Sequence, residues 1–268
     1  MEQLSGIIVS VLSLAGIVGW IQLGIRARQG IPPLPYEPRP EIRWPVGVLV
    51  IAGGWIIWLT TSVLVNSFAR WNGEVQPRTL TLEIVQQSCL MNIVILGLLI
   101  LLLTEGRLQR LADFGISRKH WQRNVLTGIY GLVLAFPAVL LVQVLMKDFR
   151  NDENMHSMLK LLNDDPGLET RLWIALAVIV LAPLTEELLF RVILQGVLRT
   201  RFKAWPSIVI SSVIFSAMHG FPDAVGLLPL AVIFGYIYER THSYVAVVVT
   251  HAAFNELNYL LALMAAGG

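Results

Sequence analysis

Long apolar stretches separated by short polar ones run along the whole chain. A helix needs about 20 predominantly apolar residues to cross the roughly 30 Å hydrocarbon core of a bilayer. Eight windows reach or approach this length: 4–24, 45–67, 82–104, 124–146, 172–195, 205–221, 224–239 and 243–264. This pattern predicts an all-α, polytopic membrane helix bundle of about eight transmembrane helices, with the short sixth and seventh helices tilted or partly re-entrant.

Composition supports a membrane protein. Hydrophobic residues make up 55% of the chain and charged residues 14%, whereas soluble domains carry about 25% charged residues. The net charge of +2 is too small to indicate nucleic-acid binding, so no nucleic-acid partner is expected. The single cysteine, Cys89, lies in an apolar stretch and is expected to pack there.

The basic residues predict how the bundle is oriented, because Lys and Arg concentrate in cytoplasmic loops. Fourteen of the 20 follow the first, third, fifth and seventh windows: Arg26, Arg28, Arg39, Arg43, Arg107, Arg110, Arg118, Lys119, Arg123, Arg191, Arg199, Arg201, Lys203 and Arg240. The other six are Arg70, Arg78, Lys147, Arg150, Lys160 and Arg171. Both termini are therefore predicted to lie outside. Since no organelle signal is recognised, we expect a multi-pass protein of a bacterial plasma membrane.

Two segments between the windows stand out. Residues 31–45 are rich in proline and are expected to be extended on the cytoplasmic surface. Residues 105–123 resemble a short interfacial helix, with Leu108, Leu111, Phe114 and Ile116 opposite Arg107, Arg110, Arg118 and Lys119. The polar residues that suggest chemistry all come later, so we divide the chain into N-terminal transmembrane helices, 1–170, and a C-terminal core, 171–268.

Two adjacent carboxylates, Glu186 and Glu187, end an apolar run. A charge at bilayer depth costs roughly 2.5 kcal/mol or more, so the pair indicates a polar cavity. Glu187 and Arg191 are four residues apart and can pair on one helix face. Glu186 points about 100° away and is the candidate general base. Pro183 lacks an amide proton and clashes with the carbonyl of residue 179, so the helix should loosen just before the acids.

Later apolar windows add His219, His251 and Asn255. Phe215 shares a helix face with His219, and His251 shares one with Asn255, because each pair is four residues apart. A single histidine on an apolar helix is usually a hydrogen-bonded core residue. Two on separate helices, near the depth of the acids, favour a functional site within the membrane.

The spacing of these residues resembles the CAAX prenyl protease, or Abi (CPBP), family of intramembrane proteases. The motifs are Glu186-Glu187-x-x-x-Arg191, Phe215-x-x-x-His219 and His251-x-x-x-Asn255, in that order on successive helices. The similarity covers roughly residues 173–258. It implies that 171–268 is a CAAX protease-like catalytic core and that a membrane-associated protein or peptide is the substrate.

The resemblance implies hydrolysis of a peptide bond within the membrane, and two mechanisms stay open. In the favoured one, which needs no cofactor, Glu186 helped by His219 deprotonates a water molecule, His251 and Asn255 bind the oxyanion, and Glu187 with Arg191 holds the acid in place. In the alternative, Glu186, His219 and His251 bind zinc or another divalent metal. We favour the first because the chain has no His-Glu-x-x-His pair and the metal version leaves its base unassigned.

A hypothesis from another class is a non-proteolytic transport or immunity protein with a buried polar core. Acids and histidines at membrane depth are common to proton relays and proteases. Asn255 distinguishes the two, because an oxyanion site uses an amide donor one turn after His251 and a proton relay does not need it.

Overall fold

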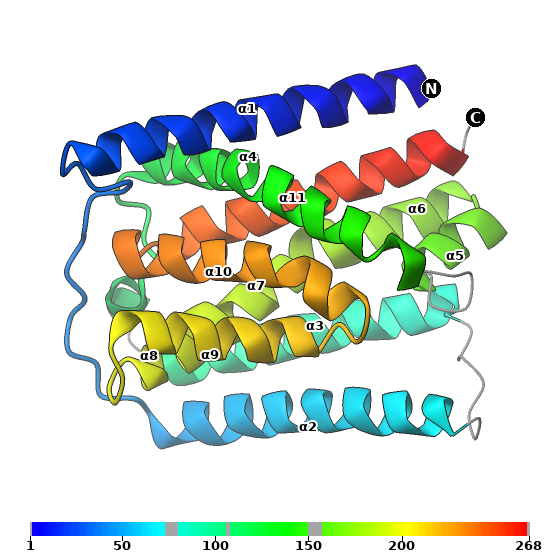
Figure 1. Cartoon of the computed structure of the whole chain (residues 1–268). Helices are drawn as coiled ribbons and strands as arrows, with labels where there is room; N and C mark the ends of the chain where they lie inside the picture. The colour runs from blue at the N-terminus through cyan, green and yellow to red at the C-terminus, as the bar shows by residue number, and fades with distance from the viewer. Residues whose placement is uncertain (1, 73–79, 106–107, 150–156, 267–268) are drawn as a thin grey trace.

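The computed structural model describes residues 2–72, 80–105, 108–149 and 157–266, and every regular element in these ranges is helical (Figure 1). The longer helices are α1 (Glu2–Arg28), α2 (Val46–Trp71), α3 (Leu82–Thr104), α4 (Trp121–Leu145), α9 (Ala204–Ala217), α10 (Asp223–Thr241) and α11 (Tyr244–Ala266). The shorter ones are η1 (Leu108–Phe114), η2 (Lys147–Phe149) and α5 (Ser157–Asp164). One further helix runs from 168 to 198 as α6 (Leu168–Ala175), η3 (Leu176–Leu181), α7 (Ala182–Glu187), η4 (Leu188–Gln195) and α8 (Gly196–Leu198).

The predicted polytopic helix bundle is confirmed, and each of the eight apolar windows coincides with a helix. Among the described residues, six helices are long and apolar enough to cross a membrane: α1, α2, α3, α4, the helix 168–198 and α11. The remaining two, α9 with 14 residues and α10 with 19, form a hairpin whose turn lies partway along the bundle (Figure 1). His219 lies in this turn, two residues after the end of α9.

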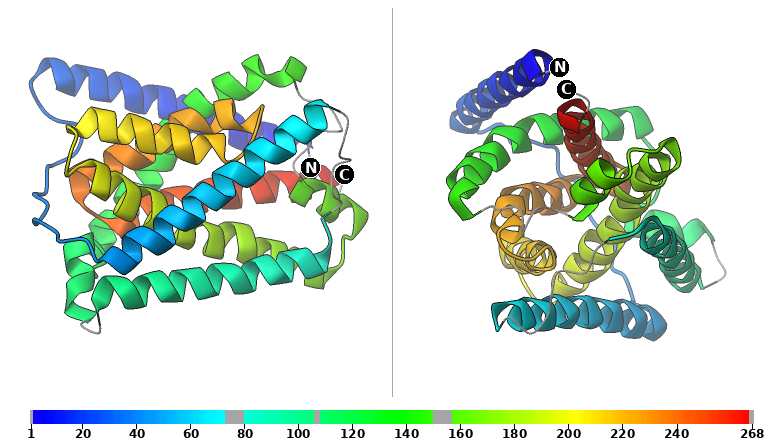
Figure 2. Two further views of the ribbon diagram at one scale, coloured as in Figure 1. Left: turned by 90° about the horizontal axis from the view of Figure 1, so that it is seen from below. Right: turned by 90° about the vertical axis from the view of Figure 1, so that its right-hand side faces the viewer.

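Helix α4 lies between α1 and the C-terminal helices α10 and α11 (Figure 2). Gly128 on α4 allows the close approach, because a Cβ atom there would lie 2.7 Å from the carbonyl oxygen of Ala246 on α11. Cys89 is buried beside Val85 and Ile174, as expected for a packing residue. Both contacts join a residue before position 170 to a residue after it. The helices on the two sides of the predicted division at 170/171 thus pack against each other.

The Pro-rich segment 31–45 contains no helix and crosses one end of the bundle between α1 and α2 (Figure 1). It is tied down by several polar contacts. Arg39 Nη2 lies 3.0 Å from Glu239 Oε2, the Glu37 amide donates to the Arg240 carbonyl at 2.8 Å, and the Arg240 guanidinium donates to the Leu34 carbonyl at 3.1 Å. The segment is thus extended, as expected, and attached to the end of α10.

The short helix expected over 105–123 is present only in part, and Phe114 does not lie on the outer apolar face predicted for it. A short 3₁₀ helix, η1, occupies 108–114, and Phe114 is fully buried against Trp44, with ring centroids 5.5 Å apart. Its carbonyl accepts a hydrogen bond from the Tyr238 hydroxyl at 2.9 Å. The Phe114 side chain therefore enters the protein core instead of lying on a bilayer surface.

The two termini lie at the same end of the bundle, opposite the Pro-rich segment (Figure 1). This agrees with placing both on one side of the membrane, and the outward direction stays a prediction. One residue in the charge count was misplaced: Arg191 is fully buried inside the bundle and belongs to no loop. Arg78, Arg107 and Arg150, which also entered the count, lie outside the described residues.

Candidate active site

The helix that carries both acids changes its hydrogen-bond register around Pro183. The segment η3 is a π-helix, and the Ala182 amide donates to the carbonyl of Ala177, five residues back. An α-helix would have placed the proline ring against the carbonyl of Ile179. The wider π-helical turn avoids this clash, so the predicted loosening of the helix before the two acids is confirmed. A second π segment, η4, follows Glu187.

Glu187 and Arg191 form the expected contact, deep in the core. Glu187 Oε2 lies 3.1 Å from Arg191 Nε, and both side chains are fully buried. The guanidinium carbon of Arg191 lies 4.9 Å from the ring centroid of Phe215 and 5.5 Å from that of Phe234. The aromatic faces thus cover the cation while the carboxylate neutralises it.

His251 on α11 contacts both acids. Its Nδ1 lies 2.8 Å from Glu187 Oε1, and its Nε2 lies 3.9 Å from Glu186 Oε2. Because a carboxylate only accepts, Nδ1 carries the proton of the first contact. The neutral ring therefore keeps a lone pair on Nε2, the nitrogen nearer Glu186.

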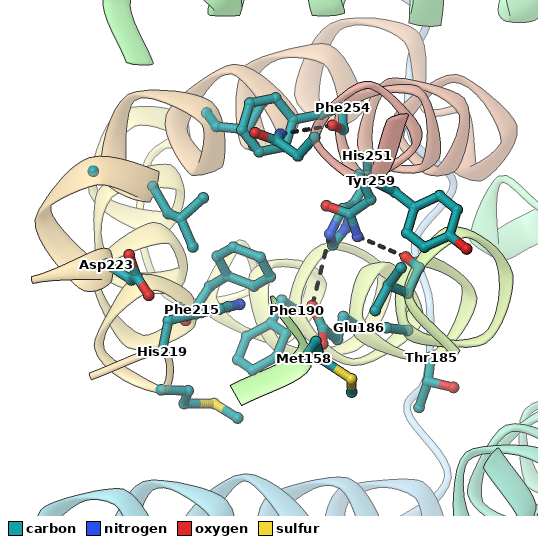
Figure 3. A pocket seen from close by; sticks show the side chains of 18 of the residues that line it. Met158, Thr185, Glu186, Phe190, Phe215, His219, Asp223, His251, Phe254 and Tyr259 are labelled. Atoms are coloured by element: carbon teal, nitrogen blue, oxygen red, sulfur yellow. Dashed lines mark hydrogen bonds and ion pairs between the residues drawn. The ribbon is translucent and has the colours of Figure 1, made fainter. Parts of the chain in front are cut away.

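Glu186 is the acid that faces open space. Its side chain is 29% exposed, against 0% for Glu187, and it lines a cavity of about 520 Å³. His219, His251 and Asn255 line the same cavity. Figure 3 shows His219 and Asp223 on one side of it and Glu186 and His251 on the other. Glu187 and Arg191 are not among the lining residues, so the motif residues divide into an exposed and a buried group.

His219 is held by its own helix. Its Nδ1 lies 3.0 Å from the carbonyl oxygen of Phe215, one turn earlier, and its ring packs 5.0 Å from the Phe215 ring. Because a carbonyl only accepts, Nδ1 carries the proton here as well. The unshared pair of the neutral ring is then on Nε2, which can accept a hydrogen bond from a water molecule in the cavity.

The amide of Asn255 has a backbone partner. Its Nδ2 donates to the Val178 carbonyl in the π segment η3 at 2.7 Å. A primary amide has two protons, so one of them stays available to a group in the cavity. The structure thus places Asn255 at the wall of the site, bound to the helix that carries the acids.

Three supporting residues were missed by the sequence analysis. The Tyr244 hydroxyl donates to the Leu184 carbonyl at 2.6 Å, and the Gln195 amide donates to the Gly235 carbonyl at 3.0 Å. Thr185 lines the cavity beside Glu186, and its buried hydroxyl has no hydrogen-bond partner among the described residues. Tyr, Gln and Thr are common in apolar helices, so no sequence signal separates these three from ordinary packing residues.

The three candidate metal ligands, Glu186, His219 and His251, do not form a compact group in this structure. Within the described part of the chain, no three His, Cys, Asp or Glu side chains converge closely enough to hold an ion. Glu186, His219 and His251 share the cavity without forming such a group. Metal-binding histidines often donate their other ring N–H to a carboxylate, and the contact of His251 Nδ1 with Glu187 has this form.

Comparison with known proteins bears on the C-terminal part of the chain. Searches of curated proteins and of solved structures found no match. A family model described as Type II CAAX prenyl endopeptidase Rce1-like matches residues 168–257. The matched range contains all three motifs, and it supports a CAAX-type intramembrane endopeptidase that acts on membrane-associated protein substrates. Residues 168–257 are therefore similar to this family, which confirms the resemblance to the CAAX proteases drawn from the three motifs.

Proposed function

We propose that the protein cleaves a peptide bond of a membrane-associated protein or peptide with a water molecule activated by Glu186. The observation that carries this proposal is the different surroundings of the two acids. Glu187 is fully buried with Arg191 and His251, whereas Glu186 faces the cavity and makes no hydrogen bond to another described residue. A carboxylate free to accept a proton next to open space is what a general base requires.

In the proposed reaction Glu186 takes one proton from the water molecule, and the resulting hydroxide attacks the carbonyl carbon of the substrate. The Nε2 lone pair of His219 accepts a hydrogen bond from the same water and orients it. When the C–N bond breaks, Glu186 returns its proton to the leaving nitrogen. The proton taken from the water ends on the leaving nitrogen, and the Glu186 carboxylate is regenerated.

The oxyanion formed by this attack needs hydrogen-bond donors, which we assign to His251 and Asn255. The amide proton of Asn255 that Val178 does not use supplies one donor. His251 donates from Nε2 only when both ring nitrogens carry protons, because Nδ1–H is bound to Glu187. The oxyanion role of His251 therefore requires the imidazolium form, with Glu187 as its counter-ion.

Two other readings define the outcomes of a test. The zinc alternative uses Glu186, His219 and His251 as ligands, which line one cavity without forming a group of three that could hold an ion among the described residues. The transport or immunity alternative uses the same polar core without cleavage.

We also propose the plasma membrane of a bacterial cell as the location.

The decisive experiment uses the purified protein and a prenylated CAAX peptide that carries a fluorophore and a quencher. Glu186→Gln keeps the shape but removes the base, so the rate of cleavage should fall by about 10²-fold or more. The matched control is Glu256→Gln on the exposed face of α11, which should keep its activity. Undiminished cleavage by Glu186→Gln removes this residue from the mechanism.

Metal dependence is tested on the same preparation. Metal content is measured after purification, and cleavage is compared with and without a chelator. Full activity in the chelated, metal-free protein supports the glutamate mechanism. Loss on chelation with recovery on adding zinc supports the metal alternative, and absence of cleavage for every peptide tested, in an intact fold, supports the non-proteolytic alternative.

A further inference from the structure

The contact between Asn255 and Val178 has a specific cause in the backbone of the helix 168–198. In the π register of η3 each amide donates to the carbonyl five residues back, as Ala182 does to Ala177. The next amide in this pattern belongs to residue 183 and would donate to Val178. Residue 183 is proline, so the Val178 carbonyl has no backbone donor.

Asn255 supplies the missing donor from another helix. Its Nδ2 lies 2.7 Å from the Val178 oxygen, although the two residues are 77 positions apart in the chain. An unpaired carbonyl in a membrane-embedded helix costs free energy, because no lipid group can bind it. The side-chain amide of α11 thus completes the backbone hydrogen bonding of η3.

The register of η3 determines which acid faces the cavity. A π segment inserts one residue into the helix and so rotates everything after it by about 100° relative to a continuous α-helix. Glu186 and Glu187 begin five residues after η3 ends, within α7. Loss of the π segment would turn both acids away from their present partners.

We infer that Asn255 is a positioning residue: its amide replaces the donor that Pro183 lacks and holds the π segment that directs Glu186 into the cavity. This role deepens the proposed function, because it rests on Glu186 being the base. It is separate from oxyanion binding, because it uses the other proton of the same amide. Pro183, Val178 and Asn255 then act as one unit across two helices.

Hydrogen–deuterium exchange of the full-length protein tests this unit without any substrate. Asn255→Ala should accelerate exchange of the amides of residues 179–187 by roughly 2- to 10-fold, as expected for the loss of one hydrogen bond. Asn258→Ala is the matched control, because Asn258 also lies on α11 and lines the cavity but donates to the carbonyl of Phe254 in its own helix. Equal exchange in the two variants overturns the inference.

A double-mutant cycle with Pro183→Ala provides the second test. Alanine restores an amide proton at residue 183, which can satisfy Val178 directly. Asn255→Ala should therefore accelerate exchange less in the Pro183→Ala background than in the wild-type background. The same acceleration in both backgrounds contradicts a shared unit. If Pro183→Ala fails to fold, the comparison of exchange between Asn255→Ala and Asn258→Ala still tests the positioning role of Asn255.

The exchange experiments and the cleavage assay can give opposite results, so the positioning role and the proposed function are tested separately. If the prenylated peptide is not cleaved but exchange still depends on Asn255, the contact that holds the π segment is supported and the proposed proteolytic function is contradicted. Conversely, Asn255→Ala can lose about 10²-fold in kcat with exchange unchanged, which would leave only the oxyanion role.

Discussion

At the scale of single residues, the site depends on two neighbouring carboxylates with different surroundings. Glu187 is enclosed by Arg191 and His251, whereas the side chain of Glu186 reaches the cavity. A buried ion pair contributes little net stability, but removing one partner leaves the other charge uncompensated. The two acids should therefore respond differently to the same substitution.

Glu187→Gln should lower the thermal unfolding midpoint, because the buried guanidinium of Arg191 loses its counter-charge at a cost of roughly 3 kcal/mol. Glu186→Gln is the matched control and should unfold close to the wild-type midpoint, since its side chain is partly exposed. The midpoints are measured by heating each purified variant in the same detergent. Equal midpoints for the two variants would show that the division of roles between the acids is wrong.

At the scale of elements, the Pro-rich segment 31–45 is linked through Glu239 to the helix that carries the two candidate acids. This buried carboxylate at the end of α10 contacts Arg39 of the segment at 3.0 Å and Arg199, just after α8, at 3.1 Å. Arg199 follows the helix that carries Glu186 and Glu187. Glu239 thus joins three pieces of chain at the end of the bundle that is predicted to be cytoplasmic.

Glu239→Gln should release the segment 31–45, because two arginines then lack their common counter-charge. Faster proteolysis within 31–45, together with a lower thermal midpoint, would report this release. Glu37→Gln is the control: the Glu37–Arg123 pair is exposed, and exposed pairs contribute only about 0–1 kcal/mol. Identical proteolysis of the two variants would contradict a special role for Glu239.

At the scale of the whole molecule, the orientation in the membrane follows from the loops at its two ends. Thr200 lies in a turn and Asn163 in the short helix α5, both are exposed, and they belong to segments predicted to be cytoplasmic and external, respectively. The native Cys89 is buried, so an introduced cysteine can be the reactive one. Chemical labelling of intact cells can therefore determine the orientation.

In intact cells, a membrane-impermeant maleimide should label Asn163→Cys and leave Thr200→Cys unlabelled until the cells are opened. The reason is the excess of basic residues in the loops on the side of residue 200. Wild-type protein, with Cys89 alone, serves as the background. The reverse labelling pattern would place both termini in the cytoplasm and contradict the predicted orientation.

The sequence by itself determined the features that depend on local spacing. Apolar length and helical periodicity predicted every long helix, the loosening before Glu186 and the contact of Glu187 with Arg191, because each is set within a few residues of the chain. The motif order also predicted the similarity to the CAAX protease family that the family model finds at residues 168–257. The apolar outer face of the segment 105–123 was predicted from the same kind of pattern and was wrong for Phe114, which is buried against Trp44 and bound by Tyr238, both distant in sequence.

Only the tertiary structure decided which atoms meet between helices. His251 reaches Glu187 across 64 positions, and Asn255 reaches Val178 across 77. Such contacts depend on the rotation and depth of α11 relative to the helix 168–198. Spacing along one helix carries no information on that rotation. The contact of His251 with Glu187 and the backbone partner of Asn255 therefore became visible only once the helices were packed together.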